Sequence, residues 1–279
     1  MRDPPFFVQD PSGLGKRAGE TPLIVEIPHA GVFVPPQFMP ELIASARAVG
    51  RDADLYVDDL YEEASLDGAS MIVSRTSRYV VDLNRAEGDF DAQSAVSGQI
   101  PSSPRGVVWR LTTEGDRALA APLRKEVLEA RLSEIYRPYH RALEALIQRK
   151  RATFGQAVIL AAHSMPSVAR VMHGDAGQVR ADVVPGTLGR TSAAGKYIDA
   201  VEAHARKRGF TVAHDEPYKG GFTTKNYGRP KDHVHVVQVE LARRLYMNEG
   251  TYRRTAGDFE AVRSWCRELV RFLGLLALD

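Results

Sequence analysis

Residues 157–163, Ala-Val-Ile-Leu-Ala-Ala-His, hold the pattern that decides the fold: a short apolar run that ends in a histidine. An unbroken apolar run of this length predicts a strand buried on both faces, because a strand with one face in water alternates apolar and polar residues. The predicted strand covers residues 157–161. Runs of the same type predict further strands at residues 23–27, 70–74, 79–83, 210–213 and 234–240.

Helical patterns separate these strands. They cover residues 54–66, 122–149, 192–208 and 252–276. Pro138 is expected to break or kink the second of them, because proline removes a backbone donor and clashes with the preceding turn. Strands that alternate with helices of this length predict a three-layer α/β/α protein around a mixed, mostly parallel sheet.

Two stretches, residues 87–113 and 171–191, fit neither pattern. Loops of this length in a compact domain usually carry function, so we expect functional loops here. The sequence contains no internal repeat and no composition break typical of a linker. We therefore expect one domain over residues 1–279, with its motifs between about residues 22 and 252.

The composition narrows the classes of protein that remain. With 279 residues, 37 Lys and Arg against 35 Asp and Glu, and 44% hydrophobic residues, the chain is neither disordered nor collagen-like nor a coiled coil. The balanced charge indicates no nucleic-acid partner, and no apolar run reaches the 18 or more residues of a membrane span. One cysteine, Cys266, cannot form an intramolecular disulfide, which favours a reducing compartment, and we expect the cytoplasm.

Polar residues lie at the carboxyl ends of four of the predicted strands. His29 follows residues 23–27, His163 follows residues 157–161, Asn84 and Arg85 follow residues 79–83, and Glu240 ends the last run. In open α/β sheets this edge is where ligands bind, in the crevice where the strand order reverses. The pattern predicts a functional site built from these residues.

Two histidines and one carboxylate would complete a catalytic zinc site, which takes three protein ligands and leaves one position open. With a single cysteine in the chain, His29 and His163 are the predicted nitrogen ligands. Asp54, at the start of a predicted helix, is the preferred third ligand and Asp52 the second choice. An ordinary helix N-cap is the alternative role for Asp54.

The segment 78–85 predicts a binding site for a carboxylate. In a strand, Tyr79, Val81 and Leu83 would share one face and Arg78, Val80, Asp82 and Asn84 the other. Arg85 can grip two carboxylate oxygens at once, and Asn84 adds a donor. Arg78 and Asp82 are expected to form an internal ion pair as the alternative to a substrate role.

Several of these motifs together resemble one enzyme family. They are Pro28-His29-Ala30-Gly31, Asp52 to Asp54 before a Val-x-x-Leu-Tyr helix, Ser77 to Arg85 (SRYVVDLNR), Ala162-His163-Ser164-Met165, Lys219-Gly220-Gly221-Phe222-Thr223 and Gln238-Val239-Glu240-Leu241. The chain is similar over residues 22–252 to the N-formylglutamate amidohydrolases, which are related to zinc carboxypeptidases and aspartoacylases. The resemblance implies a carboxypeptidase-like α/β/α fold and hydrolysis of N-formyl-L-glutamate to formate and glutamate, at the end of histidine breakdown.

A zinc amidohydrolase also needs a base and an oxyanion donor. We expect Glu240 to accept the proton of water and pass it to the leaving amine; a salt bridge to Arg243 or Arg244 is the alternative. Arg78 is the predicted oxyanion donor, in competition with Arg75.

Lys219 and Thr223 belong to a glycine-containing segment that could close on a small N-acyl amino acid; an ordinary turn is the alternative. Two other functions stay open: a deacylase or carboxypeptidase-like enzyme for another N-acyl amino acid, and a protein that binds acidic metabolites without catalysis.

Overall fold

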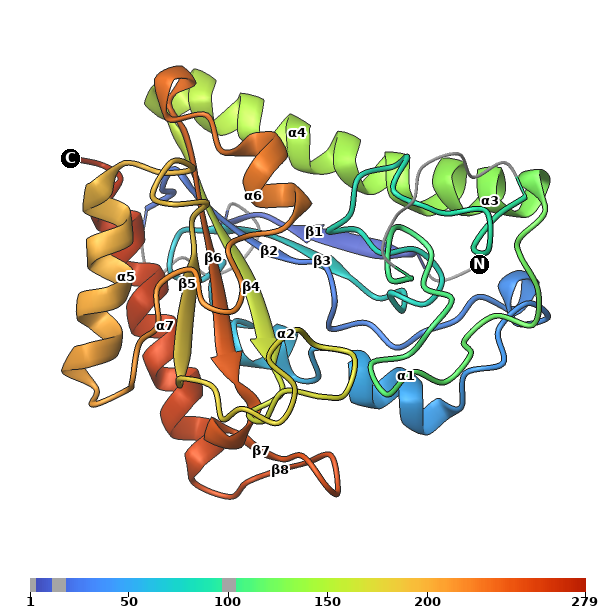
Figure 1. Ribbon diagram of the computed structural model, residues 1–279. Coiled ribbons are helices and arrows are strands. Elements are labelled where there is room, and N and C mark those ends of the chain that lie inside the picture. Colours follow the sequence, from blue (N-terminus) through green and yellow to red (C-terminus); the bar gives the residue numbers. More distant parts are fainter. Residues whose placement is uncertain (1–3, 12–18, 97–103) are drawn as a thin grey trace.

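The computed structural model describes residues 4–11, 19–96 and 104–279, and a six-stranded sheet forms its centre (Figure 1). Its strands, in the spatial order β1-β3-β2-β4-β6-β5, are β1 (Phe6–Gln9), β3 (Ser70–Ser74), β2 (Leu23–Ile27), β4 (Ala157–Met165), β6 (Val234–Ala242) and β5 (Val183–Gly186). The two edge strands β1 and β5 pair antiparallel with their neighbours, and the four central strands are parallel. The predicted mixed, mostly parallel sheet is confirmed.

Helices cover both faces of this sheet, as predicted. The helices α2 (Val57–Leu60), α5 (Gly195–Lys207) and α7 (Asp258–Leu276) pack on one face. The helices α3 (Lys125–Arg131) and α4 (Arg137–Phe154) pack on the other.

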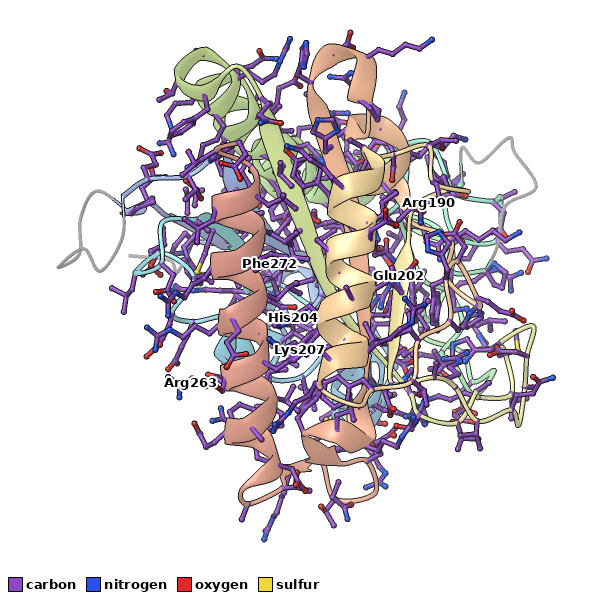
Figure 2. The ribbon with its side chains drawn as sticks, turned by 90° about the vertical axis from the view of Figure 1, so that its left-hand side faces the viewer. Arg190, Glu202, His204, Lys207, Arg263 and Phe272 are labelled. Carbon is purple, nitrogen blue, oxygen red and sulfur yellow. The ribbon has the colours of Figure 1, made fainter. Side chains whose placement is uncertain are left out.

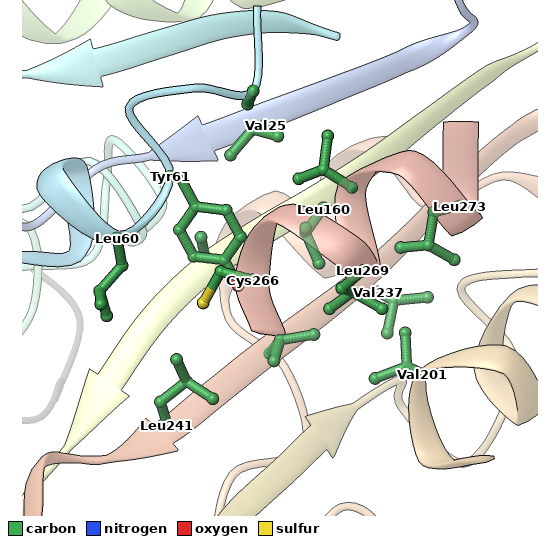
Figure 3. Packing of buried hydrophobic residues seen from close by; sticks show 14 of the residues in the cluster. Val25, Leu60, Tyr61, Leu160, Val201, Val237, Leu241, Cys266, Leu269 and Leu273 are labelled. Atoms are coloured by element: carbon green, nitrogen blue, oxygen red, sulfur yellow. The ribbon is translucent and has the colours of Figure 1, made fainter. Parts of the chain in front are cut away.

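Consecutive residues of a strand point to opposite faces, so Val25 and Ile24 of β2 belong to different core clusters. Figure 3 shows the first cluster, in which Leu269 and Cys266 of α7 pack close to Leu160 of β4.

His204 of α5 and Phe272 of α7 lie on the side of the molecule that faces the viewer in Figure 2. His204 of α5 stacks on Trp265 of α7 with ring centroids 5.0 Å apart, and Phe272 lies 6.4 Å from the same imidazole. Cys266, predicted to lie in a helix, is buried in α7 and is a free thiol.

Pro138 lies where the long predicted helix 122–149 divides. A π-helical turn, η3 (Leu132–Tyr136), separates α3 from α4 within one continuous helical run, and Pro138 is the second residue of α4. The short elements that complete the described chain are α1 (Ala46–Asp52), α6 (Phe222–Tyr227), η2 (Pro36–Phe38), η4 (Pro230–Asp232), η5 (Arg243–Leu245), β7 (Met247–Asn248) and β8 (Arg253–Arg254).

The predicted strand at residues 79–83 is wrong. These residues form turns, in which Val80 N–H bonds to the Ser77 carbonyl and the Asp82 side chain accepts the N–H of Asn84. The guanidinium of the buried Arg131 donates to the carbonyls of Tyr79 and Val80, which a neighbouring strand would otherwise bond. The predicted division of these residues between two strand faces is also wrong, because Val80, Val81 and Leu83 all pack in one core cluster.

Other element boundaries also differ from the prediction. Residues 210–213 form only one bridge, at Val212, and the predicted loop 171–191 contains β5. The predicted helix 54–66 shortens to α2 followed by turns, while β1 and α1 were not predicted. Of the long loop 87–113, residues 97–103 lie outside the described residues.

No helix within the described residues is both long enough and apolar enough to cross a lipid bilayer.

Candidate active site

The site lies at the carboxyl ends of β2 and β4, where the strand order reverses. From β2 the chain moves to β3 on one side and then to β4 on the other, which opens a crevice between β2 and β4. His29 follows the end of β2 by two residues, and His163 lies near the end of β4, which is longer than predicted. The two imidazole rings are 4.9 Å apart between centroids.

Asp54 completes a cluster with these two histidines. Its Oδ2 atom is 3.1 Å from Nδ1 of His163 and 3.6 Å from Nδ1 of His29. The Asp54 N–H donates to the His29 carbonyl at 3.0 Å, which holds this loop against the end of β2. All three side chains are buried, and one ligand atom from each lies within 4.8 Å of the others.

The donor atoms of the cluster fit a zinc ion. Two imidazole nitrogens and one carboxylate oxygen are the ligands of many catalytic zinc sites. The Nδ1 atom of His29 is buried and has no hydrogen-bond partner among the described residues, although a buried polar atom normally has one. A cation at the centre of the cluster would satisfy it.

Asp52 is hydrogen-bonded to residues away from the two histidines, so the geometry favours Asp54 as the acidic metal ligand. Both Asp52 oxygens accept protein donors: Tyr79 Oη at 2.5 Å, the Thr113 N–H and hydroxyl at 3.0 and 2.5 Å, and Arg51 Nε at 3.1 Å. In contrast, Asp54 has a single arginine contact, from Arg243 to Oδ1 at 3.2 Å, which leaves Oδ2 facing the histidines.

Asp82 orients His29 from behind. Its Oδ1 lies 2.8 Å from His29 Nε2, while its Oδ2 accepts Arg78 Nη2 at 2.8 Å and Trp109 Nε1 at 2.9 Å. Burial alone raises the pKa of Asp82, but the charges of Arg78 and His29 outweigh it and hold this pKa well below its usual range. A permanently ionised Asp82 keeps the hydrogen of His29 on Nε2 and leaves Nδ1 as the acceptor.

Protonation within the cluster follows its charges. Burial opposes ionisation of Asp54, yet the neighbouring His163 and His29 side chains outweigh it and hold the pKa of Asp54 well below its usual value. Burial lowers the pKa of His163, but Asp54 and Glu240 outweigh it and the pKa rises. The cluster is therefore an anionic site that favours a positive charge between the rings.

Glu240 lies beside His163 on the next strand. The two residues are register partners of β6 and β4, so their side chains emerge on the same face of the sheet. Glu240 is buried, and burial raises the pKa of its carboxyl group. Its Oε1 accepts Gln238 Nε2 at 2.9 Å, whereas Arg243 pairs with Asp54 and Arg244 with Asp182, so the predicted alternative of an ion pair for Glu240 is wrong.

Asn84 sits at the centre of a buried amide network. Its Oδ1 accepts the Thr223 N–H at 2.9 Å, and its Nδ2 lies 3.3 Å from His163 Nε2 and 3.4 Å from Gln238 Oε1. A Cβ atom on Gly221 would lie 2.2 to 2.5 Å from the Asn84 side chain, so only glycine allows this approach. The two Nδ2 contacts are long, which leaves donor strength for a ligand.

Thr223 lies behind the cavity, which corrects its prediction as a substrate contact. It is fully buried, its hydroxyl donates to Glu26 at 3.1 Å, and its N–H positions Asn84. Arg85 and Lys219 do line the cavity, and the Arg85 guanidinium has no hydrogen bond or ion pair among the residues that the structure describes.

Arg78 and Arg75, the two candidates for the oxyanion donor, lie in different surroundings. Arg78 lines the cavity and packs over Trp109, with its Cζ 4.3 Å from the ring centroid. Arg75 is exposed on the other side of its segment, over Phe7. The expected pair of Arg78 with Asp82 also exists, so this arginine is held in the cavity wall by its partner.

These residues surround one cavity of about 380 Å³, called here the site cavity. This volume suits a small amino-acid derivative. Its lining includes His29, Asp54 and His163, then Glu240 and the cationic residues Arg51, Arg78, Arg85, Arg105, Lys219 and Arg243.

Four residues of the site were not predicted as functional. The sequence indicates Asp82 only as a partner of Arg78, and Arg243 only as a possible partner of Glu240. Gln238 lies two residues from Glu240 on a strand, and this spacing signals a shared face. Arg105 belongs to the long loop that was expected to be functional, but no local pattern singles it out.

Known proteins resemble this chain over most of its length. Residues 21–247 match the family model of N-formylglutamate amidohydrolase. The chain belongs to the N-formylglutamate amidohydrolase family. It is 35% identical over 264 residues to an N-formylglutamate deformylase of Pseudomonas aeruginosa strain PAO1, which covers 93% of this chain and 95% of that protein. An N-formylglutamate deformylase of Pseudomonas putida is 33% identical, over 84% of this chain and 86% of that protein.

Solved structures show the same family fold. A crystal structure of N-formylglutamate amidohydrolase from Ralstonia eutropha JMP134 superposes with a TM-score of 0.86 at 27% identity, over 98% of both chains. The gene product Atu2144 of Agrobacterium tumefaciens shares the fold at a TM-score of 0.70 and 21% identity, over 98% of this chain and 96% of that one. As a member of this family the chain is a hydrolase, and the predicted family and enzyme class are confirmed.

Proposed function

We propose that this amidohydrolase cleaves the formamide bond of N-formyl-L-glutamate in a zinc-dependent reaction that yields formate and L-glutamate. The observation that carries the proposal is the convergence of His29, Asp54 and His163 beside Glu240 in a cation-lined cavity. Both Pseudomonas relatives are named for the same substrate.

His29, Asp54 and His163 would hold the zinc ion. When bound, such an ion polarises a carbonyl group and makes water more acidic. The protein prepares the site for it: Asp82 fixes the tautomer of His29, and Arg243 fixes the orientation of Asp54.

Glu240 acts as the general base and then as the general acid. Its carboxylate takes a proton from water while the water oxygen bonds to the formyl carbon. The same proton then passes to the amide nitrogen as the carbon–nitrogen bond breaks, so the amine leaves neutral. Burial raises the pKa of Glu240, and a carboxylate with a raised pKa is a stronger proton acceptor than one in water.

Charge on the substrate is met by arginines in the cavity wall. Arg78, held by Asp82, stabilises the negative charge that develops on the formyl oxygen. Arg85 binds the α-carboxylate of the substrate and Asn84 adds a donor, while Lys219 contributes a second positive charge from the facing segment. Thr223 supports this arrangement through its N–H bond to Asn84.

The metabolic setting is proposed from the family resemblance: the last step of histidine breakdown, in the cytoplasm. The single, buried, free Cys266 agrees with a reducing compartment. We propose that all motifs belong to one domain.

Formate release and metal content test the proposal together. The purified zinc-loaded protein should release formate from N-formyl-L-glutamate and hold about one zinc per chain. His163→Ala should lose both the zinc and the activity, whereas His204→Ala, on the outer surface of α5, should keep both. Protein that binds glutamate derivatives without releasing formate, with zinc present, would refute the enzyme and favour a binding protein.

A panel of formyl, acetyl and succinyl derivatives of glutamate tests the acyl group. We expect the formyl derivative to be the fastest. A faster acetyl or succinyl derivative would reassign the chain to a deacylase for another N-acyl amino acid.

A further inference from the structure

The second half of the long loop, residues 104–113, is attached to the turn that carries Asp82. The carbonyl of Val107 accepts the backbone N–H of Asp82 at 2.8 Å. Two residues further along the loop, the indole N–H of Trp109 donates to Asp82 Oδ2 at 2.9 Å. The loop therefore contacts Asp82 at both its backbone and its side chain, and Trp109 supplies the side-chain contact.

Trp109 is held firmly by its surroundings. Only 3% of the residue is exposed, yet it forms part of the wall of the site cavity. Its ring packs edge to face with that of Tyr79, with centroids 5.5 Å apart, and Val49 and Ala118 belong to the same small core cluster. Aromatic rings in this arrangement attract each other beyond the effect of the area that they bury. The packing therefore fixes the orientation of the indole.

The indole of Trp109 constrains Arg78 in two ways. The Arg78 Cζ atom lies 4.3 Å from the ring centroid, which is a cation–π contact. In addition, the indole N–H and the Nε and Nη2 atoms of Arg78 all donate to one oxygen, Asp82 Oδ2, at 2.9, 3.1 and 2.8 Å. The guanidinium is therefore fixed at one edge by a carboxylate and over its plane by an aromatic ring.

This arrangement leaves one nitrogen of Arg78 for a ligand. Nε and Nη2 both bond to Asp82, whereas the contact of Nη1 among the described residues is a long one, 3.5 Å, to the carbonyl of Asp52. Arg78 lines the site cavity, and 15% of its side chain is exposed. An arginine side chain is otherwise free to adopt many rotamers, so a guanidinium that is already fixed loses little freedom when it meets a developing charge.

We propose that Trp109 is a positioning residue for the hydrolytic reaction: its N–H and its ring hold the Arg78 guanidinium so that Nη1 stays available to the negative charge that develops on the substrate. This inference rests on the proposed function, in which Arg78 is the oxyanion donor, and extends it to the loop that supports this donor. Asp82 contacts His29 through its other oxygen, Oδ1, so loss of the indole N–H should affect Arg78 more than zinc binding.

The first test substitutes Trp109 in zinc-loaded protein and follows formate release from N-formyl-L-glutamate. Trp109→Phe keeps a ring beside Arg78 but loses the N–H donor. We expect kcat to fall roughly tenfold and KM to change less than about twofold, because the oxyanion forms only in the transition state. Trp109→Leu removes both the donor and the ring and should lower kcat about 100-fold. Trp265→Phe, in the contact between α5 and α7, is the matched control and should leave both constants unchanged.

A double-mutant cycle distinguishes positioning of Arg78 from general support of the fold. When Arg78→Ala is already present, Trp109→Phe should lower kcat less than about twofold, because the residue that it positions is gone. Zinc content and melting temperature should stay at the values of the Arg78→Ala protein. An unchanged kcat in Trp109→Phe, or a tenfold loss in both backgrounds, would overturn the inference while leaving the proposed function intact. Wild-type protein that releases no formate would overturn the proposed function and, with it, this role of Trp109.

Fluorine NMR of protein labelled with 5-fluorotryptophan gives a readout that depends neither on catalysis nor on a substitution of Trp109. The chain contains two tryptophans, so the spectrum should show two resonances, which Trp265→Phe assigns. Arg78→Ala should move the Trp109 resonance and leave that of Trp265 in place, because the guanidinium packs on Trp109. An unmoved Trp109 resonance would show that the ring does not sense Arg78, and it would overturn the inference even if the Trp109 variants fail to fold.

Discussion

Asp82 shows how strongly the proposed metal site depends on a residue that would not touch the metal. One of its oxygens lies against His29, and the other accepts both Arg78 and Trp109. A single buried carboxylate therefore sets the tautomer of a predicted ligand and the position of the predicted oxyanion donor.

Asp82→Asn tests this role of Asp82. The amide keeps the shape of the side chain but loses its charge. We expect zinc affinity to fall about 10- to 100-fold, because loss of the hydrogen-bond partner of a metal-binding histidine usually lowers metal affinity by this factor. Competition with a coloured chelator measures the affinity. Asp182→Asn, which alters an ion pair with Arg244 outside the site, is the control, and equal affinity in the two variants would remove Asp82 from the metal site.

Glu240→Gln tests whether Glu240 acts as the general base without contributing to zinc binding. The substitution keeps an oxygen that can accept Gln238 Nε2 but cannot take a proton from water. We expect kcat to fall on the order of 10²- to 10⁴-fold, the usual contribution of a general acid–base group, with zinc content unchanged. Steady-state kinetics measure kcat, and metal analysis of the same protein measures its zinc content. A near-normal kcat would contradict the role of Glu240 as the base.

At the scale of elements, the site depends on how closely the segment before α6 approaches the turn at residues 82–85. Gly221 packs directly on Asn84, and its N–H donates to Gln238 at 2.8 Å. The side-chain amide of Gln238 also bonds to Glu240, so the turn at residues 82–85, the glycine segment and β6 share one hydrogen-bond network.

Gly221→Ala should disturb this network without unfolding the protein. The new Cβ would overlap the Asn84 side chain, which must shift from its present position. We expect kcat/KM to fall at least about tenfold, because misplacing a positioning group usually lowers the rate. The matched control is Gly50→Ala in α1, where nothing lies within 4 Å and alanine favours the helix. Wild-type kinetics for Gly221→Ala would show that the close approach has no functional role.

At the scale of the whole molecule, buried neutral histidines connect stability to pH. His235 is buried, and its Nδ1 accepts the N–H of Ala194 at the start of α5. Burial, followed by the charges of His233 and Lys196, lowers the pKa of His235 to about 4. At pH values between about 4 and the ordinary histidine pKa near 6.5, His235 is therefore protonated in the unfolded chain but neutral in the folded protein.

The free energy of unfolding should therefore decrease as the pH falls from about 6.5 to 4, and be independent of this group above that range. Urea unfolding at several pH values measures the slope. His235→Gln retains a side-chain acceptor but does not titrate, so its slope should be smaller than that of the wild type. Identical slopes would exclude His235 from the acid sensitivity.

The sequence alone determined the central strands and the edge of the sheet at which the site lies. Long apolar runs such as 157–161 specify buried parallel strands, and polar residues placed after them must then meet at the carboxyl ends, whatever the details of packing. His29, His163 and Glu240 were predicted on this basis. The segment 79–83 misled, because its apolar residues suit a strand but its carbonyls are bonded by turns and by Arg131, which lies about fifty residues away in the chain.

Only the tertiary structure shows which of Asp52 and Asp54 lies beside the histidines, which of Arg75 and Arg78 lines the cavity, and in which direction Thr223 points. Each choice depends on a partner distant in sequence: Thr113 for Asp52, Trp109 for Arg78 and Glu26 for Thr223. The hydrophobic periodicity of a sequence predicts which face of a helix or strand a residue occupies. It does not predict which hydrogen-bond donors a distant loop will place against that face. Hydrogen bonds are short and directional, so those donors are set by the folded chain as a whole.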